Sequence, residues 1–137
     1  IYYYKIVLYY SMNNTISNFL IKLKNSSLVN KEVINISLEN MTLKIVSILY
    51  KEGFIQSFKV NLETKIIQIY LRYSFNKSVF KNVKIISLPS RLLYVKYKEL
   101  TNISSKNNFI LVSTTKGLKT FLECKKNHLG GKILFLC

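Results

Sequence analysis

The sequence lacks the residue types from which most catalytic and metal sites are built. Its 137 residues hold one histidine, two cysteines and six acidic residues, all of them glutamate. A catalytic nucleophile needs a neighbouring base that a third group orients, and these scattered side chains do not form such a set. His128, Cys124 and Cys137 also lack the spacing of a zinc site or of a disulfide framework. We therefore expect no enzyme activity, no metal, no cofactor and no small-molecule substrate.

Glycines and long apolar runs are scarce as well. Only four glycines are present, so a Walker-type phosphate loop is excluded. The most apolar stretch, Ile1–Tyr10, is far shorter than the roughly 20 residues that cross a bilayer. It also lacks the small-residue cleavage site of a secretory signal. We therefore expect no membrane span, and we interpret residues 1–11 as an N-terminal extension, an added strand or a tail packed on a neighbour.

Negative charge is the third deficit, because the formal net charge is +15 at pH 7. Self-repulsion of this size opposes a compact state, so the simplest partner is a polyanion, either nucleic acid or an anionic membrane surface. The only arginines are Arg72 and Arg91, which favours point-charge contacts to phosphate over bidentate reading of bases. Residues 74–137 contain twelve basic and two acidic residues, whereas residues 1–73 contain nine basic and four acidic residues. The C-terminal half should therefore make more of the contacts with a polyanion.

Five residue types with AT-rich codons, Ile, Lys, Asn, Tyr and Phe, make up about half of the chain, while alanine and tryptophan are absent. This bias concerns the gene rather than the physics of the protein. It indicates an extremely AT-rich genome such as that of an organelle, with a mitochondrion preferred and a plastid as the alternative.

Hydrophobic periodicity predicts an α+β protein in two domains. The first, residues 12–73, is expected to be a layer of helices on a sheet in the order α-β-α-β-β. Its predicted elements are a helix Met12–Asn25, a strand Val33–Ser37, a helix from a cap at Ser37 to a stop at Gly53, and paired strands Phe54–Val60 and Lys65–Tyr73.

The second predicted domain, residues 74–137, is mostly β with one short helix. Strands are expected at Asn82–Leu88 and Leu92–Val95, on either side of a turn at Pro89, and Lys96–Asn108 is interpreted as a basic, polar connection.

The end of this domain contains its most informative stretch. An apolar strand, Phe109–Val112, runs into the polar loop Ser113–Gly117, and Thr120-x-x-Glu123 then forms a capping box that opens a short helix. The helix is expected to run until Gly130-Gly131, before a closing strand Ile133–Cys137. Three hydroxyls and a lysine would thus share one exposed loop, and these are groups that bind sugar and phosphate oxygens.

This stretch resembles the signature of the small-subunit ribosomal protein eight family, Ser-Thr-Ser-x-Gly-x-Met-Thr, a short helix, Gly-Gly-Glu and a last strand. The loop, Thr120 and the glycine pair occur here in the same order and spacing. In the first half, Lys22-Leu23-Lys24-Asn25 resembles the family's Arg-x-Arg-Asn, and Glu52-Gly53-Phe54-Ile55 resembles its Glu-Gly-[Tyr/Phe]-Ile turn. The resemblance covers Met12–Cys137.

The resemblance implies a structural constituent of the small ribosomal subunit, on an organellar ribosome given the composition. It implies a primary rRNA-binding protein that binds the central domain of small-subunit rRNA, helps nucleate its assembly and contacts neighbouring ribosomal proteins. The implied RNA-binding residues are Ser113, Thr114, Thr115, Lys116, Gly117, Thr120, Gly130 and Gly131, with Lys22, Lys24, Asn25 and Arg91 in addition.

The chain departs from the family pattern at several positions. Thr115 stands in place of a serine, Lys132 in place of the glutamate after the glycine pair, and Leu136 in place of a tyrosine. Two other functions stay open on sequence alone. One is a basic peripheral protein held on an anionic membrane by Ile1–Tyr10, and the other is a regulator that binds its own messenger RNA.

Overall fold

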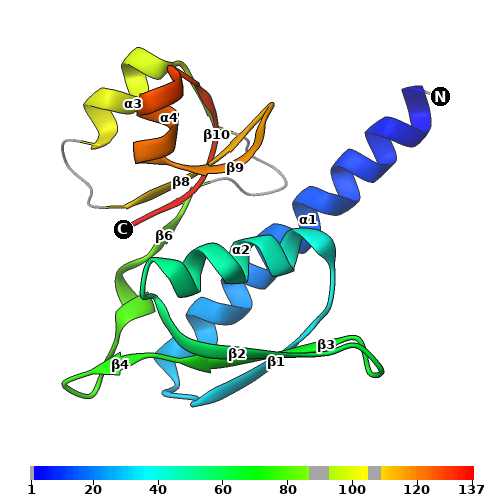
Figure 1. Ribbon diagram of the computed structural model, residues 1–137, viewed down its shortest axis with the longest axis vertical. Helices are drawn as coiled ribbons and strands as arrows, with labels where there is room; N and C mark the ends of the chain where they lie inside the picture. Colours follow the sequence, from blue (N-terminus) through cyan, green and yellow to red (C-terminus); the bar gives the residue numbers. More distant parts are fainter. Residues whose placement is uncertain (1, 87–92, 105–108) are drawn as a thin grey trace. The chain divides into compact units, whose positions relative to one another are not determined.

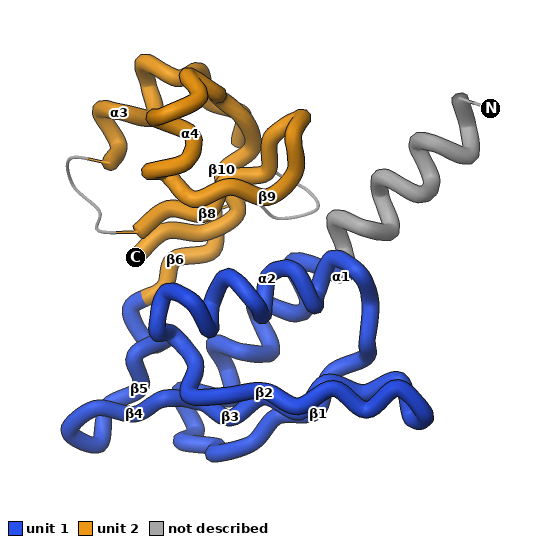
Figure 2. Tube along the Cα trace, viewed as in Figure 1, with its two compact units in different colours: residues 1–82 blue, residues 83–137 orange. Residues whose placement is uncertain are grey.

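A computed structural model describes residues 2–86, 93–104 and 109–137, with side chains from Thr15 onward. Contacts divide the chain into two compact units, unit 1 (Ile1–Asn82) and unit 2 (Val83–Cys137), which Figure 2 shows in two colours. Each unit combines helices with an antiparallel sheet, so the predicted α+β class is confirmed. Residues 74–82 make their contacts within unit 1, although the sequence pattern predicts them in the second domain.

Unit 1 is built on a three-stranded antiparallel sheet in the order β1-β3-β2. Its strands are β1 (Val33–Ser37), β2 (Ile55–Asn61) and β3 (Ile66–Leu71), which confirms the three predicted strands within a few residues. Alternate residues of β1 and β3 are buried, as expected for a sheet with one covered face. Figure 1 shows α1 and α2 together on one side of this sheet.

Helix α2 (Asn40–Lys51) buries Ile45, Val46 and Leu49. Its N-cap is Glu39, not the predicted Ser37, because the backbone N–H of Glu39 donates to Thr42 Oγ1 at 3.1 Å in a capping box.

Helix α1 (Tyr2–Leu28) extends the predicted helix by ten residues toward the N-terminus. The predicted strand is therefore wrong from Tyr2 onward, while the packing of residues 1–11 on a neighbour stays a prediction. No glycine or proline interrupts the sequence between Tyr2 and Leu28, so nothing in the backbone ends the helix earlier. Within the part of the chain that the structure describes, none of the helices combines the length and apolarity of a membrane span.

A short hairpin and a 3-10 turn complete unit 1. The hairpin pairs β4 (Tyr73–Ser74) with β5 (Lys77–Ser78), and η1 (Val79–Asn82) follows it. Phe80 in η1 is fully buried and meets the Phe54 ring edge-on, with 6.3 Å between centroids. The hairpin is thus attached to the core of unit 1 through its C-terminal end.

Unit 2 contains a second antiparallel sheet, in the order β6-β10-β8-β9, with β7 also paired to β10. Its core cluster consists of Leu100, Ile110, Val112, Cys124 and Ile133. Its strands and helices, in chain order, are β6 (Lys84–Ile85), β7 (Tyr94–Val95), α3 (Tyr97–Ser104), β8 (Ile110–Thr114), β9 (Gly117–Thr120), α4 (Phe121–Asn127) and β10 (Gly131–Leu136).

Two predictions for the part of unit 2 that precedes α4 are wrong. Residues 97–104 form helix α3 instead of a connection, so the described part of unit 2 has two helices rather than one. Leu100 is fully buried in the core, and that tertiary contact stabilises a segment of polar composition. The loop predicted at Ser113–Gly117 is a tight hairpin, because residues 117–120 form strand β9. The predicted turn at Pro89 lies outside the described residues.

Candidate RNA-binding surface

The hydroxyl hairpin, defined as residues 113–117, joins β8 to β9 through a two-residue turn, Thr115-Lys116. Thr114 pairs with Gly117 across the turn. The Thr114 hydroxyl donates to the carbonyl of Gly117 at 2.8 Å and accepts from the backbone N–H of Lys116 at 3.2 Å. Gly117 has a φ of +101°, a backbone conformation that residues other than glycine rarely adopt. Thr114 and Gly117 therefore shape the turn.

The other polar side chains of the hydroxyl hairpin are available to a ligand. Thr115 and Lys116 are exposed at the tip, and Ser113 is half-buried at its base. Among the described residues, no hydrogen bond occupies the hydroxyl of Ser113 or of Thr115. The hairpin thus offers two hydroxyls and one ammonium group, held in place by the internal bonds of Thr114.

Helix α4 begins immediately after β9, at the predicted cap. Thr120 and Glu123 form the capping box, with the Thr120 N–H donating to Glu123 Oε2 at 3.2 Å, so this prediction is confirmed. The predicted end of the helix at the glycine pair is wrong. Helix α4 ends at Asn127, where His128 adopts the left-handed conformation (φ 50°) and the Leu129 N–H donates to Cys124 O at 3.0 Å.

The glycine pair, Gly130-Gly131, has a packing role. A Cβ on Gly131 would lie 2.4 Å from the carbonyl oxygen of Ser113, and one on Gly130 would lie 2.6 Å from that of Val95. Both distances are far shorter than real Cβ contacts, and the atoms met are backbone atoms that cannot swing away. The missing side chains therefore let β10 approach both the base of the hydroxyl hairpin and the chain just before α3.

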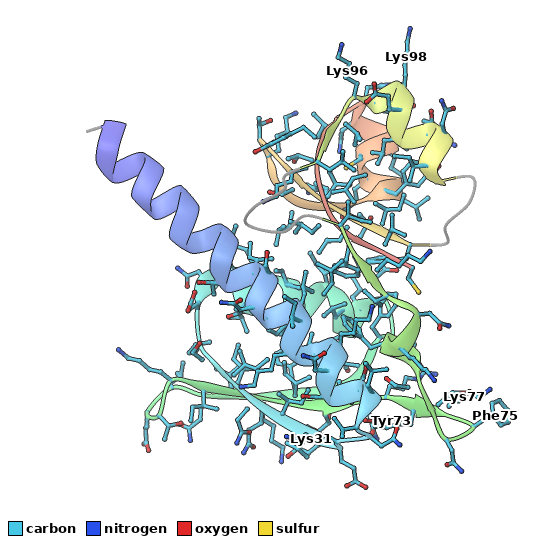
Figure 3. All side chains as sticks on the ribbon, turned by 180° about the vertical axis from the view of Figure 1, so that it is seen from behind. Lys31, Tyr73, Phe75, Lys77, Lys96 and Lys98 are labelled. Atoms are coloured by element: carbon cyan, nitrogen blue, oxygen red, sulfur yellow. The ribbon has the colours of Figure 1, made fainter. Side chains whose placement is uncertain are left out.

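Basic residues lie near the glycine pair, because the backbone of Lys96 faces Gly130 and the last turn of α4 precedes the pair in sequence. Figure 3 shows Lys96 and Lys98 extending from the start of α3, and Lys125 and Lys126 occupy the last turn of α4. The ring of His128 packs edge-on against Tyr97 with 4.9 Å between centroids, next to Lys96 and Lys98 in sequence.

Sequence analysis missed Lys96 and Lys98 as candidate site residues. The signal that could have found them is the helix start formed by Glu99 and the apolar Leu100. In the structure, the Glu99 carboxylate accepts the Lys96 N–H at 3.1 Å.

Comparison with known proteins identifies the family of the chain. The family model described as ribosomal protein S8 matches residues 14–137. The chain belongs to the ribosomal protein S8 family. A relative named small ribosomal subunit protein uS8 from Vesicomyosocius okutanii is 33% identical over 126 residues, covering 90% of this chain and 96% of the relative. Proteins of the same name from Ruthia magnifica and Halothermothrix orenii are 32% and 33% identical over 126 and 128 residues, with the same coverage.

Lys132 follows the glycine pair and lies at the base of the hydroxyl hairpin. It pairs with Ser113 on β8 and with Tyr94 on β7, and it is only 5% exposed. Burial lowers the pKa of its ammonium group below the usual value. A cation thus lies beside the glycine pair, within the strand that supports the hydroxyl hairpin.

The candidate residues of the first half lie on helix α1, which belongs to unit 1, whereas the hydroxyl hairpin belongs to unit 2. Lys22 is exposed and its Nζ donates to the carbonyl of Asn35 at 2.8 Å. Lys24 is half-buried and Asn25 is exposed. Arg91, the remaining candidate, lies outside the described residues.

The residues described by the structure contain no group of three or more side chains that could hold a metal ion.

Proposed function

We propose that this chain, a structural constituent of the small ribosomal subunit as a member of the S8 family, binds small-subunit rRNA through unit 2. The proposed contacts are the hydroxyls of Ser113 and Thr115, the ammonium group of Lys116 and the backbone beside the glycine pair. Thr114, Gly117 and Thr120 act mainly by fixing the hairpin and the start of α4. The observation that carries the proposal is the close approach of Gly131 to Ser113, which joins hydroxyl hairpin and glycine pair into one surface.

The chemistry of these groups suits folded RNA. Proteins read RNA helices through the 2′-hydroxyls and phosphates that line the wide, shallow minor groove. Hydroxyl side chains and backbone N–H groups are partners for those oxygens, while lysines add affinity by releasing counterions from the phosphates. A surface of this kind recognises shape, which fits a chain with only two arginines for reading bases.

The resemblance supports a finer proposal about the target. We propose that the chain binds the central domain of the rRNA and helps nucleate its assembly, with neighbouring ribosomal proteins as further partners. Lys22, Lys24, Asn25 and Arg91 would add secondary contacts. The codon bias of the composition supports an organellar ribosome, in a mitochondrion or a plastid.

Filter binding tests the proposal directly. The full chain is titrated against its own central-domain rRNA helix and against a scrambled helix of equal length, at two salt concentrations. We expect a preference for the cognate helix that survives the higher salt. Equal and salt-labile binding to both helices would contradict shape-specific recognition.

Variants separate specificity from charge in the same assay. Ser113→Ala with Thr115→Ala should weaken cognate binding by roughly 1–3 kcal/mol, the range for lost hydrogen bonds to buried or charged groups. Lys22→Ala or Lys24→Ala should mainly reduce the salt slope, by about one for each lost phosphate contact. Thr64→Ala, an exposed threonine between β2 and β3, is the matched control and should change neither quantity. If the double variant weakens cognate and scrambled RNA equally, the hydroxyl hairpin is not a specificity element.

A further inference from the structure

The β4–β5 hairpin of unit 1 exposes an aromatic ring at its tip. Phe75 is 97% exposed, more than any other large apolar side chain among the described residues. Tyr73 pairs with Ser78 and Ser74 with Lys77, so Phe75 and Asn76 form the two-residue turn. Figure 3 shows Phe75 and Lys77 at the far end of this hairpin, with Tyr73 and Lys31 nearer its base. No part of the described chain covers the ring.

The backbone at this tip makes phenylalanine an unfavourable choice. Phe75 and Asn76 have φ values of 50° and 59°, both in the left-handed region. Two-residue turns of this type favour asparagine, aspartate and glycine, while a bulky side chain is a rare outlier there. Phe75 thus opposes the local backbone preference and also exposes apolar surface to water. Neither the turn nor the core of unit 1 benefits from the ring, which points to a role in binding.

The hairpin holds its tip on a fixed support. The Tyr73 hydroxyl donates to the carbonyl of Lys31, and the Val79 N–H donates to the carbonyl of Arg72 at 3.3 Å. The Phe80 N–H donates to Ser78 Oγ at 3.2 Å, and the Phe80 ring is buried in the core. An aromatic ring presented on an anchored hairpin loses little conformational entropy when it meets a partner.

Charge around the hairpin identifies the kind of partner. Lys77 and Lys31 are exposed, and so is Arg72, whose Nη1 also donates to Gly53 O at 3.2 Å. Glu32 adds an acidic group to this region, beside Tyr73 and in a hollow that Asn76 also lines. An exposed aromatic ring with Lys77 on the same hairpin, on a chain of net charge +15, is complementary to an unpaired nucleotide, because the base stacks on the ring and a flanking phosphate meets the cation.

We propose that Phe75 stacks on an unpaired base of RNA, with Lys77 and Lys31 facing the adjacent phosphates, as a second RNA contact made by unit 1. The inference rests on the proposed function only for the identity of that RNA, the small-subunit rRNA. Stacking of this kind tolerates different bases, so the contact adds affinity and positions unit 1 rather than reading sequence.

Because the chain has no tryptophan, Phe75→Trp creates a single fluorescent reporter at the proposed contact. Titration of this full-length variant with the central-domain rRNA should quench the emission of the introduced indole, since the indole stacks on a base. Leu62→Trp is the matched control, at another exposed apolar residue (77%) between β2 and β3, and its emission should stay unchanged. If filter binding shows salt-resistant rRNA binding while the emission of the Phe75→Trp variant stays unchanged, the inference is overturned although the proposed function stands.

Phe75→Asn then separates binding from folding. Asparagine suits the left-handed conformation, so the thermal midpoint of unfolding should stay the same or rise. Affinity for the rRNA should fall about 5- to 150-fold, the loss expected for one base stacked on an aromatic ring, and Phe75→Tyr should retain it. Unchanged affinity of the Phe75→Asn variant would overturn the inference. The Phe75→Trp variant can also be mixed with a ribosomal protein or with anionic vesicles. If these additions shift its indole emission to the blue while RNA does not quench that emission, the inference is overturned in favour of an apolar partner.

Discussion

The close approach of β10 to β8 makes Gly131→Ala the most direct test of how the candidate surface is built. The added Cβ would lie 2.4 Å from Ser113 O and 3.0 Å from Val112 Cγ1. Ordinary contacts begin near 3.4 Å, so the two strands would have to separate by about 1 Å at this point. Overpacking of this kind costs about 1–3 kcal/mol, and here the obstructing atom is backbone, which leaves little room for relief.

Urea unfolding and amide hydrogen exchange measure this effect. We expect a lower free energy of unfolding, with exchange protection lost first at the pairing of Lys132 with Ser113. Because Ser113 moves with its strand, affinity for the cognate rRNA should fall at least as far as in Ser113→Ala alone. Thr115→Ala, at the exposed tip of the same hairpin, should stay within about 0.5 kcal/mol of the unchanged chain. A Gly131→Ala variant as stable as Thr115→Ala would refute the packing role of the glycine pair.

Three further predictions concern unit 2. The free energy of unfolding should increase as the pH rises from 7 toward 10.5, since burial lowers the folded-state pKa of Lys132, and Lys132→Met should reduce this increase; urea titrations from pH 7 upward measure this. Cys124, fully buried with a pKa raised first by burial and next by Glu123, should react with a thiol reagent only on unfolding, after the half-exposed Cys137. Thr120→Ala should lower unfolding stability by about 0.5–2 kcal/mol through loss of the α4 cap, with Thr101→Ala as a control.

Local signals explain which parts of the fold could be predicted from the sequence. The capping box of Thr120 and Glu123 involves residues three apart, so sequence spacing alone identifies it. The strands of unit 1 could also be predicted from the sequence. One covered sheet face makes buried and exposed residues alternate along each strand, and the buried positions include Ile34, Ile36, Ile67 and Ile69. These features depend on near neighbours or on a simple division between inside and outside.

The elements that were missed depend on contacts between distant segments. Strand β9 contains Gly117 and Lys119 and has no apolar alternation, so only its pairing with β8 makes it a strand. Helix α3 has a polar sequence, and its stability comes from Leu100, which is buried against β8, α4 and β10 residues of the core cluster. The end of α4 at His128 required a left-handed residue other than glycine, which sequence patterns rarely anticipate.

The glycine pair shows the same division within the candidate site. Its sequence position suggested a helix stop, and the family resemblance suggested a contact with RNA, but neither indicated what the missing side chains accomplish. In the structure, Gly131 admits the carbonyl of Ser113 and Gly130 admits that of Val95, so one dipeptide sets the spacing of β10 from two other segments. The hydroxyls of the hairpin can be recognised from the sequence as candidate binding groups because they are polar. Their position depends on two glycines, which have no side chain. A substitution at either glycine should therefore disturb the proposed RNA binding without removing a single polar group.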